Sequence, residues 1–173
     1  MKIGIISDTH KKIGRAQKAI NLLVDEGAEY IIHAGDIVKE EILDLIVSTN
    51  LPYTCVIGNN DFHLREVMDN YNLYSEPHYF KIKDTRFKLM HHPLYMSPDA
   101  DIIVYGHTHI YDCDYKNGKL FLNPAEVCAR DSDISSCIML KIDDDKYKIT
   151  YYTREVGKTE WHKRVTTYQK EKK

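Results

Sequence analysis

Hydrophobic residues follow two alternating patterns in the first third of the chain, and these patterns predict strands and helices in turn. Short β-branched runs at 2–7, 30–34 and 53–57 are typical of buried strands. Between them, residues 15–26 and 39–48 carry apolar side chains at the spacing of an amphipathic helix. This β-α-β-α-β order predicts a parallel sheet with helices packed on it.

The pattern changes to antiparallel hairpins in the rest of the chain. Asp84-Thr85 and Asn117-Gly118 each separate two strand-like runs, and Asn-Gly is a strong hairpin signal. The expected strands are 78–83, 86–91, 102–105, two within 110–122, 134–142 and 146–153. Together, the two parts of the chain predict two sheets packed in one layered domain.

Length and composition are those of an ordinary globular protein, with 173 residues of which 43% are hydrophobic and 29% charged. We expect a single domain over 1–160, followed by a basic tail at 161–173. No apolar run approaches the roughly 18 residues that a membrane span needs. The first apolar run meets Asp8 too early for a signal peptide, so we expect a cytoplasmic protein without a membrane partner.

Charge and cysteine content exclude further classes of protein. The net charge is −2, from 24 basic and 26 acidic residues, whereas binders of duplex nucleic acid carry a basic excess. Nucleic acid is therefore not the expected partner. The four cysteines, Cys55, Cys113, Cys128 and Cys137, show no C-x-x-C spacing, which argues against a thiolate zinc cluster or a redox pair.

Polar residues with metal-binding side chains collect where the expected strands end. The strand-end motifs are Asp8-Thr9-His10, Gly35-Asp36, Gly58-Asn59-Asn60-Asp61, His91-His92 and Gly106-His107-Thr108-His109. Ligands of open α/β sheets bind at the carboxyl ends of the strands. Each motif alone has an ordinary explanation as a turn or a buried histidine. Their recurrence at the same end of five strands favours one functional site.

The residue types narrow the chemistry of this site to transition metals. The candidate ligands are Asp8, His10, Asp36, Asn59, His91, His107 and His109. Imidazole, carboxylate and amide oxygen suit Zn, Mn, Fe or Ni, and seven groups are too many for one ion. Two ions fit if one carboxylate bridges them, and Asp36 is the candidate bridge. Two metals about 3.5–4 Å apart can acidify a water and clamp a phosphoryl group for in-line displacement.

The remaining histidines are expected to have other roles. His33 lies within a strand, so packing or support of a ligand is the expected role. His63 and His92 lie near the site in sequence and are candidates to protonate a leaving group. We expect His78 and His162 to be structural or surface residues.

These motifs, in this order over about residues 1–150, resemble those of the calcineurin-like metallophosphoesterases. Ser7-Asp8-Thr9-His10 and Asn123-Pro124 are most similar to the small single-domain bacterial and archaeal phosphodiesterases of that superfamily. The resemblance implies an α/β fold, a four-layer α/β/β/α sandwich of two mixed sheets with flanking helices. It also implies a di-metal centre that hydrolyses phosphodiester bonds by a metal-bridging hydroxide.

The resemblance also implies how the ligands are shared. One ion would be held by Asp8, His10, Asp36 and His109, and the other by Asp36, Asn59, His91 and His107. The catalytic residues would be Asp36, Asn60 and Asp61. The expected cofactor is two divalent transition-metal ions per chain, chosen from Mn, Ni, Fe and Zn, with Mn favoured.

Three positions depart from the family pattern. Asn60 stands where many members carry a histidine that protonates the leaving group, so the resemblance implies no general acid at this position. His92 stands where a glycine is common, and Ala125 replaces the glycine of an Asn-Pro-Gly segment. Pro93 and Pro98 discourage a helix between His91 and His107, so we expect a loop and an open site.

Two classes of function are compatible with this sequence. A phosphodiesterase acting on a small phosphodiester is the favoured one, with a phosphomonoesterase as a variant. The alternative is a non-catalytic scaffold, because the retromer subunit of the same fold resembles such enzymes. The complete set of candidate ligands favours the enzyme. By analogy with small relatives, a homodimer or a higher oligomer is expected.

Overall fold

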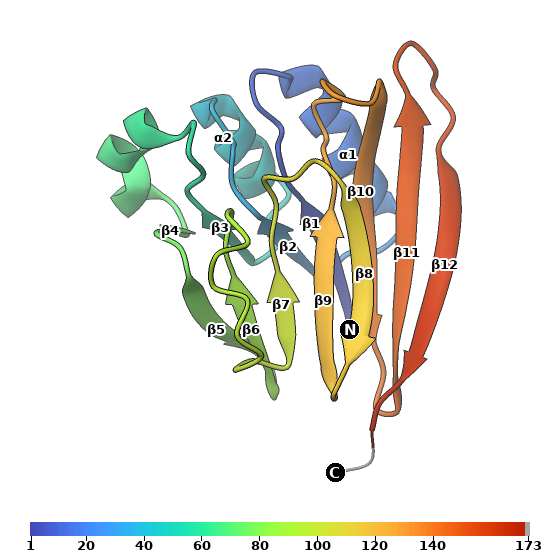
Figure 1. Cartoon of the computed structure of the whole chain (residues 1–173). Helices are drawn as coiled ribbons and strands as arrows, with labels where there is room; N and C mark the ends of the chain where they lie inside the picture. The colour runs from blue at the N-terminus through green and yellow to red at the C-terminus, as the bar shows by residue number, and fades with distance from the viewer. Residues whose placement is uncertain (172–173) are drawn as a thin grey trace.

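Two β-sheets pack face to face, and the helices lie on the outer side of the larger sheet (Figure 1). The computed structural model describes residues 1–171. The larger sheet has the order β12 (His162–Gln169), β11 (Lys146–Glu155), β10 (Ile134–Ile142), β1 (Lys2–Ile6), β2 (Tyr30–His33), β3 (Tyr53–Val56) and β4 (Leu73–Tyr74). The smaller sheet has the order β5 (His78–Ile82), β6 (Thr85–Leu89), β7 (Ile102–Val104), β9 (Lys119–Pro124) and β8 (Tyr111–Lys116).

The helices are α1 (Ile13–Asp25), α2 (Glu40–Ser48) and the 3-10 helix η1 (Phe62–Asn70). Strands β1 to β4 are parallel to their neighbours, whereas β10 pairs with β1 in the antiparallel sense. In the smaller sheet, β6, β7 and β9 are parallel. The expected α/β class with two mixed sheets and flanking helices is therefore confirmed. The helices of the described residues all lie on the larger sheet, however, so the second helical layer of the expected four-layer sandwich is not found among them.

Strand β1 shows why its sequence is apolar without interruption. Its side chains alternate between two buried faces: Ile3 and Ile5 pack against the smaller sheet, and Ile6 packs toward the helices. Gly4 faces α1, and a methyl group there would lie 2.9 Å from Leu23 Cδ1. The helix thus approaches the strand closely, and the centre of the larger sheet is buried on both sides.

The structure differs from the expected tail at the C-terminus. His162–Gln169 form β12, which is the edge of the larger sheet and pairs with β11 in the antiparallel sense. The guanidinium of Arg164 lies over the rings of Tyr111 and Tyr151, at 5.0 and 5.6 Å from their centroids. This stacking ties a largely exposed, basic strand to the fold. Residues 172–173 of the expected tail lie outside the described residues.

A loop covers the outer face of the smaller sheet. Residues 90–101 join β6 to β7 without a helix, as the two prolines predict. Lys88 is buried and anchors this loop, because its Nζ donates hydrogen bonds to Ser97 Oγ at 2.8 Å and to Asp99 at 3.0 Å. Within residues 1–171, no helix is long and apolar enough to cross a membrane.

Candidate metal centre

The carboxyl ends of five strands bring the expected ligands to one edge of the two sheets. The chain leaving β1 carries Asp8 and His10, and the chain leaving β7 carries His107 and His109; β2, β3 and β6 lead to Asp36, Asn59 and His91. All seven side chains are linked by contacts of 3.9 Å or less between their nitrogen and oxygen atoms. The structure therefore brings together every ligand that the sequence predicts.

Five of the seven residues have a left-handed backbone. The φ angles are 52° at Asp8, 45° at His10, 56° at Asp36, 66° at His107 and 58° at His109. Non-glycine residues rarely adopt such angles, and each costs on the order of 1–3 kcal/mol. Strain of this kind persists where the surrounding fold enforces it, and it gathers at functional sites. Here the sharp turns direct the side chains of successive strand ends toward one point.

Two glycines allow these turns to approach one another. A methyl group at Gly58 would lie 2.3 Å from the backbone nitrogen of Asp36. One at Gly106 would lie 2.1 Å from Ser7 Oγ and 2.9 Å from Asp8 Oδ2. Any side chain at either position would therefore push apart the loops that carry the candidate ligands.

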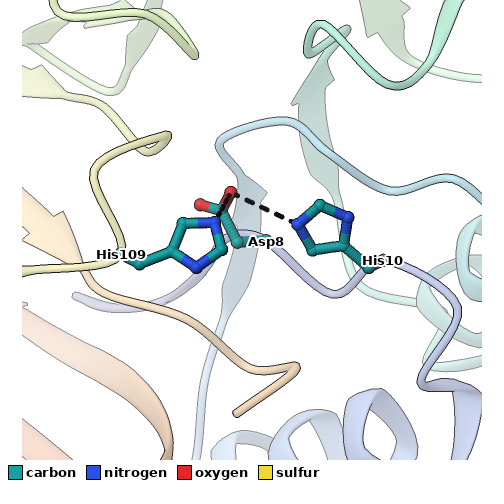
Figure 2. A group of neighbouring side chains, drawn as sticks. All are labelled: Asp8, His10 and His109. Atoms are coloured by element: carbon teal, nitrogen blue, oxygen red, sulfur yellow. Dashed lines mark ion pairs between the residues drawn. The ribbon is translucent and has the colours of Figure 1, made fainter. Parts of the chain in front are cut away.

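The first group of ligands consists of Asp8, His10 and His109, which converge in Figure 2. Asp8 Oδ1 lies 3.0 Å from His109 Nε2 and 3.9 Å from His10 Nε2. Asp8 Oδ1 and His10 Nε2 are buried and have no hydrogen-bond partner within residues 1–171. Buried polar atoms without partners are costly, and a cation between these atoms would satisfy them. The donor set thus fits a metal ion.

Opposite charges and burial set the protonation of this group. The Asp8 carboxylate beside it raises the pKa of His109, whereas burial lowers the pKa of His10 despite the nearby carboxylates. The second oxygen of Asp8 is held by Ser7 Oγ at 2.6 Å and by the backbone amide of His107 at 3.1 Å. Only Oδ1 is left to face the two imidazoles.

The second group consists of Asp36, Asn59, His91 and His107. Asn59 Oδ1 lies 3.0 Å from His91 Nε2 and 3.2 Å from His107 Nδ1. His91 is fully buried, and its Nε2 lies 3.4 Å from Asp36 Oδ1. One amide oxygen, one carboxylate oxygen and two imidazoles therefore share a small volume, which is the ligand chemistry of a second transition-metal ion.

Asp36 lies between the two groups. Its Oδ2 is 3.6 Å from His10 Nε2 in the first group, and its Oδ1 is 3.4 Å from His91 Nε2 in the second. Burial raises the pKa of Asp36, but the hydrogen bonds from His91 and Asn60 outweigh this and hold it well below the usual range. The carboxylate is thus ionised and presents one oxygen to each group.

Hydrogen bonds behind the imidazoles fix their orientation. His91 Nδ1 lies 2.8 Å from the carbonyl oxygen of Ala34, and His109 Nδ1 lies 2.8 Å from Glu126 Oε2. Both contacts leave Nε2 free toward the site, as in metal-bound histidines.

Glu126 contacts the candidate ligand His109, and the sequence analysis did not identify it as part of the site. It is fully buried and accepts hydrogen bonds from the backbone amides of Arg130, Asp131 and Ser132. Burial opposes its ionisation, but these donors and Cys128 lower its pKa to about 2. One feature of the sequence could have identified it, because Glu126 is the one charged residue between 120 and 129.

Asn60 and Asp61 support Asp36 and its loop. Asn60 donates to both oxygens of Asp36, from its backbone nitrogen at 2.9 Å and from Nδ2 at 2.7 Å. Asp61 is fully buried and accepts hydrogen bonds from the backbone amides of Ile37, Val38 and Gly58 at 2.7–3.0 Å. Its oxygens thus tie the turn after β2 to the turn after β3, which is a positioning role.

The structure also shows the surroundings of three other histidines and the backbone conformation of Ala125. His33 is fully buried against Thr9 Oγ1 at 2.9 Å, and burial lowers its pKa to about 3. His92 Nδ1 lies 2.7 Å from Glu76 Oε1, and the ring of His92 lies 4.3 Å from that of His107. His63 contacts the carbonyl of Val38. Ala125 has φ 61°, so it adopts a conformation that favours glycine.

A cavity of about 430 Å³ adjoins the first group of ligands, at His10. Its lining includes the candidate ligand His10, the supporting residue Asn60, and the cations Lys11, Lys12 and Arg130. A small anionic molecule fits this combination of volume and charge.

Comparisons with known proteins identify relatives of the chain. A family model described as "Calcineurin-like phosphoesterase superfamily domain" matches residues 1–145. The chain is 30% identical over 162 residues to Phosphodiesterase MJ0936 of Methanocaldococcus jannaschii, which covers 86% of this chain and 97% of the relative.

Solved structures show the same fold. A structure described as a novel archaeal phosphodiesterase superposes with a TM-score of 0.75 at 27% identity, covering 96% of this chain and 100% of that one. Vacuolar Protein Sorting 29 from Cryptosporidium parvum gives a TM-score of 0.81 at 21% identity, covering 98% of each chain. At that identity, the second likeness shows the fold alone.

Proposed function

The chain belongs to the calcineurin-like phosphoesterase superfamily, and from this we propose that it is a phosphodiesterase that works with two divalent metal ions. The relative from Methanocaldococcus jannaschii is named a phosphodiesterase, which supports hydrolysis of diesters. The observation that carries the proposal is the placement of Asp36, with one oxygen toward His10 and the other toward His91.

In this proposal, Asp8, His10, Asp36 and His109 hold one ion, and Asp36, Asn59, His91 and His107 hold the other. The ions, when bound, would acidify a bridging water for attack on phosphorus and neutralise charge on the phosphoryl oxygens. The imidazole and carboxylate ligands suit Mn, Fe, Ni and Zn, and we propose Mn.

The chain's own residues hold and orient the reacting groups. Asn60 keeps both oxygens of Asp36 in place, and Asp61 fixes the loop that carries Asp36. Glu126 keeps the ring of His109 turned toward the site. A neutral Asn60 cannot deliver a proton to the leaving group, so activated aryl esters are the better substrates.

A non-catalytic scaffold is the second candidate, favoured by the likeness in fold to Vacuolar Protein Sorting 29. A scaffold does not need seven ligand-type residues gathered in one place, five of them with a strained backbone and three of them buried, so the enzyme remains our proposal. The cytoplasmic location and the homo-oligomer stay predictions.

The test is metal analysis of protein purified without a chelator, followed by assays with the reconstituted metal. We expect two divalent ions per chain, turnover of bis(p-nitrophenyl) phosphate, and slower turnover of p-nitrophenyl phosphate. Metal-loaded protein that hydrolyses neither ester would favour the scaffold. Faster hydrolysis of the monoester would make the protein a phosphomonoesterase.

A further inference from the structure

A second cavity, of about 440 Å³, opens at the N-terminus of α1. Five of its lining residues are cations, and the others are apolar or glycine. The cations of this basic pocket are Lys11, Lys12, Arg15, Lys18 and Arg154. None of them forms an ion pair with a carboxylate in the described part of the chain. This concentration of unpaired cations stands out in a protein of net charge −2.

The N-terminus of α1, which faces this pocket, lacks the residues that normally stabilise the start of a helix. Helix N-termini favour acidic residues and capping side chains, yet the first turn of α1 has no acid and Lys12 provides no side-chain cap. The backbone amides of Ile13 and Gly14 donate to no acceptor within residues 1–171. The free amides, the helix dipole and the cations all attract negative charge, so this end of the helix is suited to bind an anion.

Arg154, on β11, supplies an independent observation. It is only 4% exposed, yet it lines the pocket, and its Nε has no hydrogen-bond partner in the described residues. Its Nη1 donates to the carbonyl of Lys158, and its guanidinium lies over Trp161 at 5.1 Å from the ring centroid. Burial and the nearby Arg15 lower the pKa of Arg154. A buried guanidinium without a carboxylate is costly, and an anion in the pocket would relieve that cost.

The basic pocket borders the cavity beside the candidate metal centre. Lys11 and Lys12 line both this pocket and the cavity that contains His10 and Asn60. Arg15 also donates to the carbonyl oxygen of Cys128, which lines the cavity at the metal centre.

We propose that the basic pocket binds a second phosphate group of the substrate while the scissile diester lies at the metal centre. This inference rests on the proposed function and names its substrate class, a phosphodiester that carries a further phosphate, such as a phosphorylated nucleotide ester. One phosphate placed among several unpaired cations and two free amides makes charge-assisted hydrogen bonds.

The decisive experiment compares two substrates that differ by one phosphate. These are thymidine 5′-(p-nitrophenyl phosphate) and the same ester with a 3′-phosphate. We expect the 3′-phosphate to raise kcat/KM about tenfold, because hydrogen bonds between charged groups contribute on that scale. The readout is the ratio of kcat/KM between the two esters, which cancels general damage to catalysis.

Variants connect this ratio to the pocket. Lys18→Gln and Arg154→Gln should each bring the ratio toward one. Lys81→Gln, an exposed lysine on β5 in the other sheet, should leave the ratio unchanged. Lys18 is exposed, so its variant keeps the test valid if Arg154→Gln fails to fold. A ratio near one in the wild-type enzyme, or one that Lys18→Gln leaves unaltered, would overturn the inference while the phosphodiesterase activity still stands.

A binding measurement on metal-free protein separates the inference from the proposed function. Thymidine 3′,5′-bisphosphate should bind in the presence of a chelator, more weakly in Lys18→Gln and equally in Lys81→Gln. If the bisphosphate binds in this way but the metal-loaded protein hydrolyses neither ester, the phosphate-binding role of the pocket is supported and the proposed phosphodiesterase activity is contradicted. If millimolar inorganic phosphate instead changes turnover of the ester without a 3′-phosphate in wild type but not in Lys18→Gln, the pocket takes free phosphate and the substrate assignment is wrong.

Discussion

The candidate metal centre and the basic pocket share a border, and their charges are arranged in opposite ways. At the metal centre, the carboxylates of Asp8 and Asp36 face imidazoles at 3.0–3.9 Å, and buried acceptor atoms remain without a proton donor. In the basic pocket, cations including Lys18 and Arg154 form no ion pair with a carboxylate among residues 1–171. In each region, the charge that the protein leaves unbalanced indicates the charge of its ligand. One region is suited to metal cations, and the other to an anion.

The largest effect is expected from Asp36→Asn, which breaks the metal side of this comparison. An amide has one acceptor oxygen and no charge, so it cannot serve both groups of ligands. Loss of a supporting residue alone typically costs 10–100-fold in metal affinity or activity, so we expect a loss of more than about a hundredfold here. Metal content and turnover of bis(p-nitrophenyl) phosphate measure it. Asp69→Asn, at an exposed carboxylate of η1, is the control. Retention of two ions by Asp36→Asn would refute the bridging role.

Glu126→Gln should weaken one half of the metal centre. The variant keeps the shape of the side chain but removes the charge behind His109 Nδ1. We expect about 10–100-fold weaker metal binding at the group formed by Asp8, His10 and His109, and less change at the other group. Metal titrations that resolve the two sites provide the measurement. Asp131→Asn is the matched control, since Asp131 lies 3.1 Å from the same nitrogen but is exposed. Equal weakening of both sites would contradict the assignment.

Asn60→His tests the missing proton donor. In the wild type, rates should fall steeply from aryl to alkyl diesters, because Asn60 cannot transfer a proton. A positioned acid typically contributes roughly 10²–10⁴-fold, but nothing here orients an imidazole, so we expect the alkyl-to-aryl rate ratio to rise about tenfold.

The same assay examines the other candidate acids. Asn60→Ala removes the hydrogen bond from Nδ2 to Asp36, so it should weaken metal binding more than it changes this ratio. His63→Ala and His92→Ala should leave the ratio unchanged at equal metal occupancy. A fall in the ratio in either variant would identify an acid that we have not assigned.

The smallest expected effect comes from His33, and it is a change in the stability of the fold with pH. Its pKa is about 3 in the folded protein, against an ordinary 6.5, so the unfolded chain binds one more proton between these values. His33 therefore supports the fold fully above pH 6.5, and this contribution is lost as the pH falls toward 3, by up to about 1.4 kcal/mol per pH unit.

Denaturant unfolding of metal-free protein over this pH range measures the effect. His33→Gln should show a shallower fall in the free energy of unfolding than the wild type as the pH decreases. Parallel curves for the two proteins would mean that His33 is protonated in the folded state.

Much of the fold and most of the candidate site followed from local patterns. The strands that end at Asp8, Asp36 and Asn59 are short apolar runs, and parallel strands necessarily bring their carboxyl ends to one edge. The prolines after His91 correctly predicted the loop 90–101. The pattern did not predict β12, because this edge strand is mostly exposed and carries Lys163 and Arg164 but no apolar run, so its sequence resembles a solvated tail.

The sequence by itself determined which ligand types stand at the strand ends, since residue identity and hydrophobic period are local properties. The tertiary structure decided what depends on contacts between distant segments. It placed Glu126 behind His109, turned Asn60 onto Asp36, and brought Arg154 of β11 to the N-terminus of α1. These contacts follow from the packing of sheets and helices, and no local pattern encodes them. For the same reason, the basic pocket is invisible in a chain whose overall charge is close to neutral.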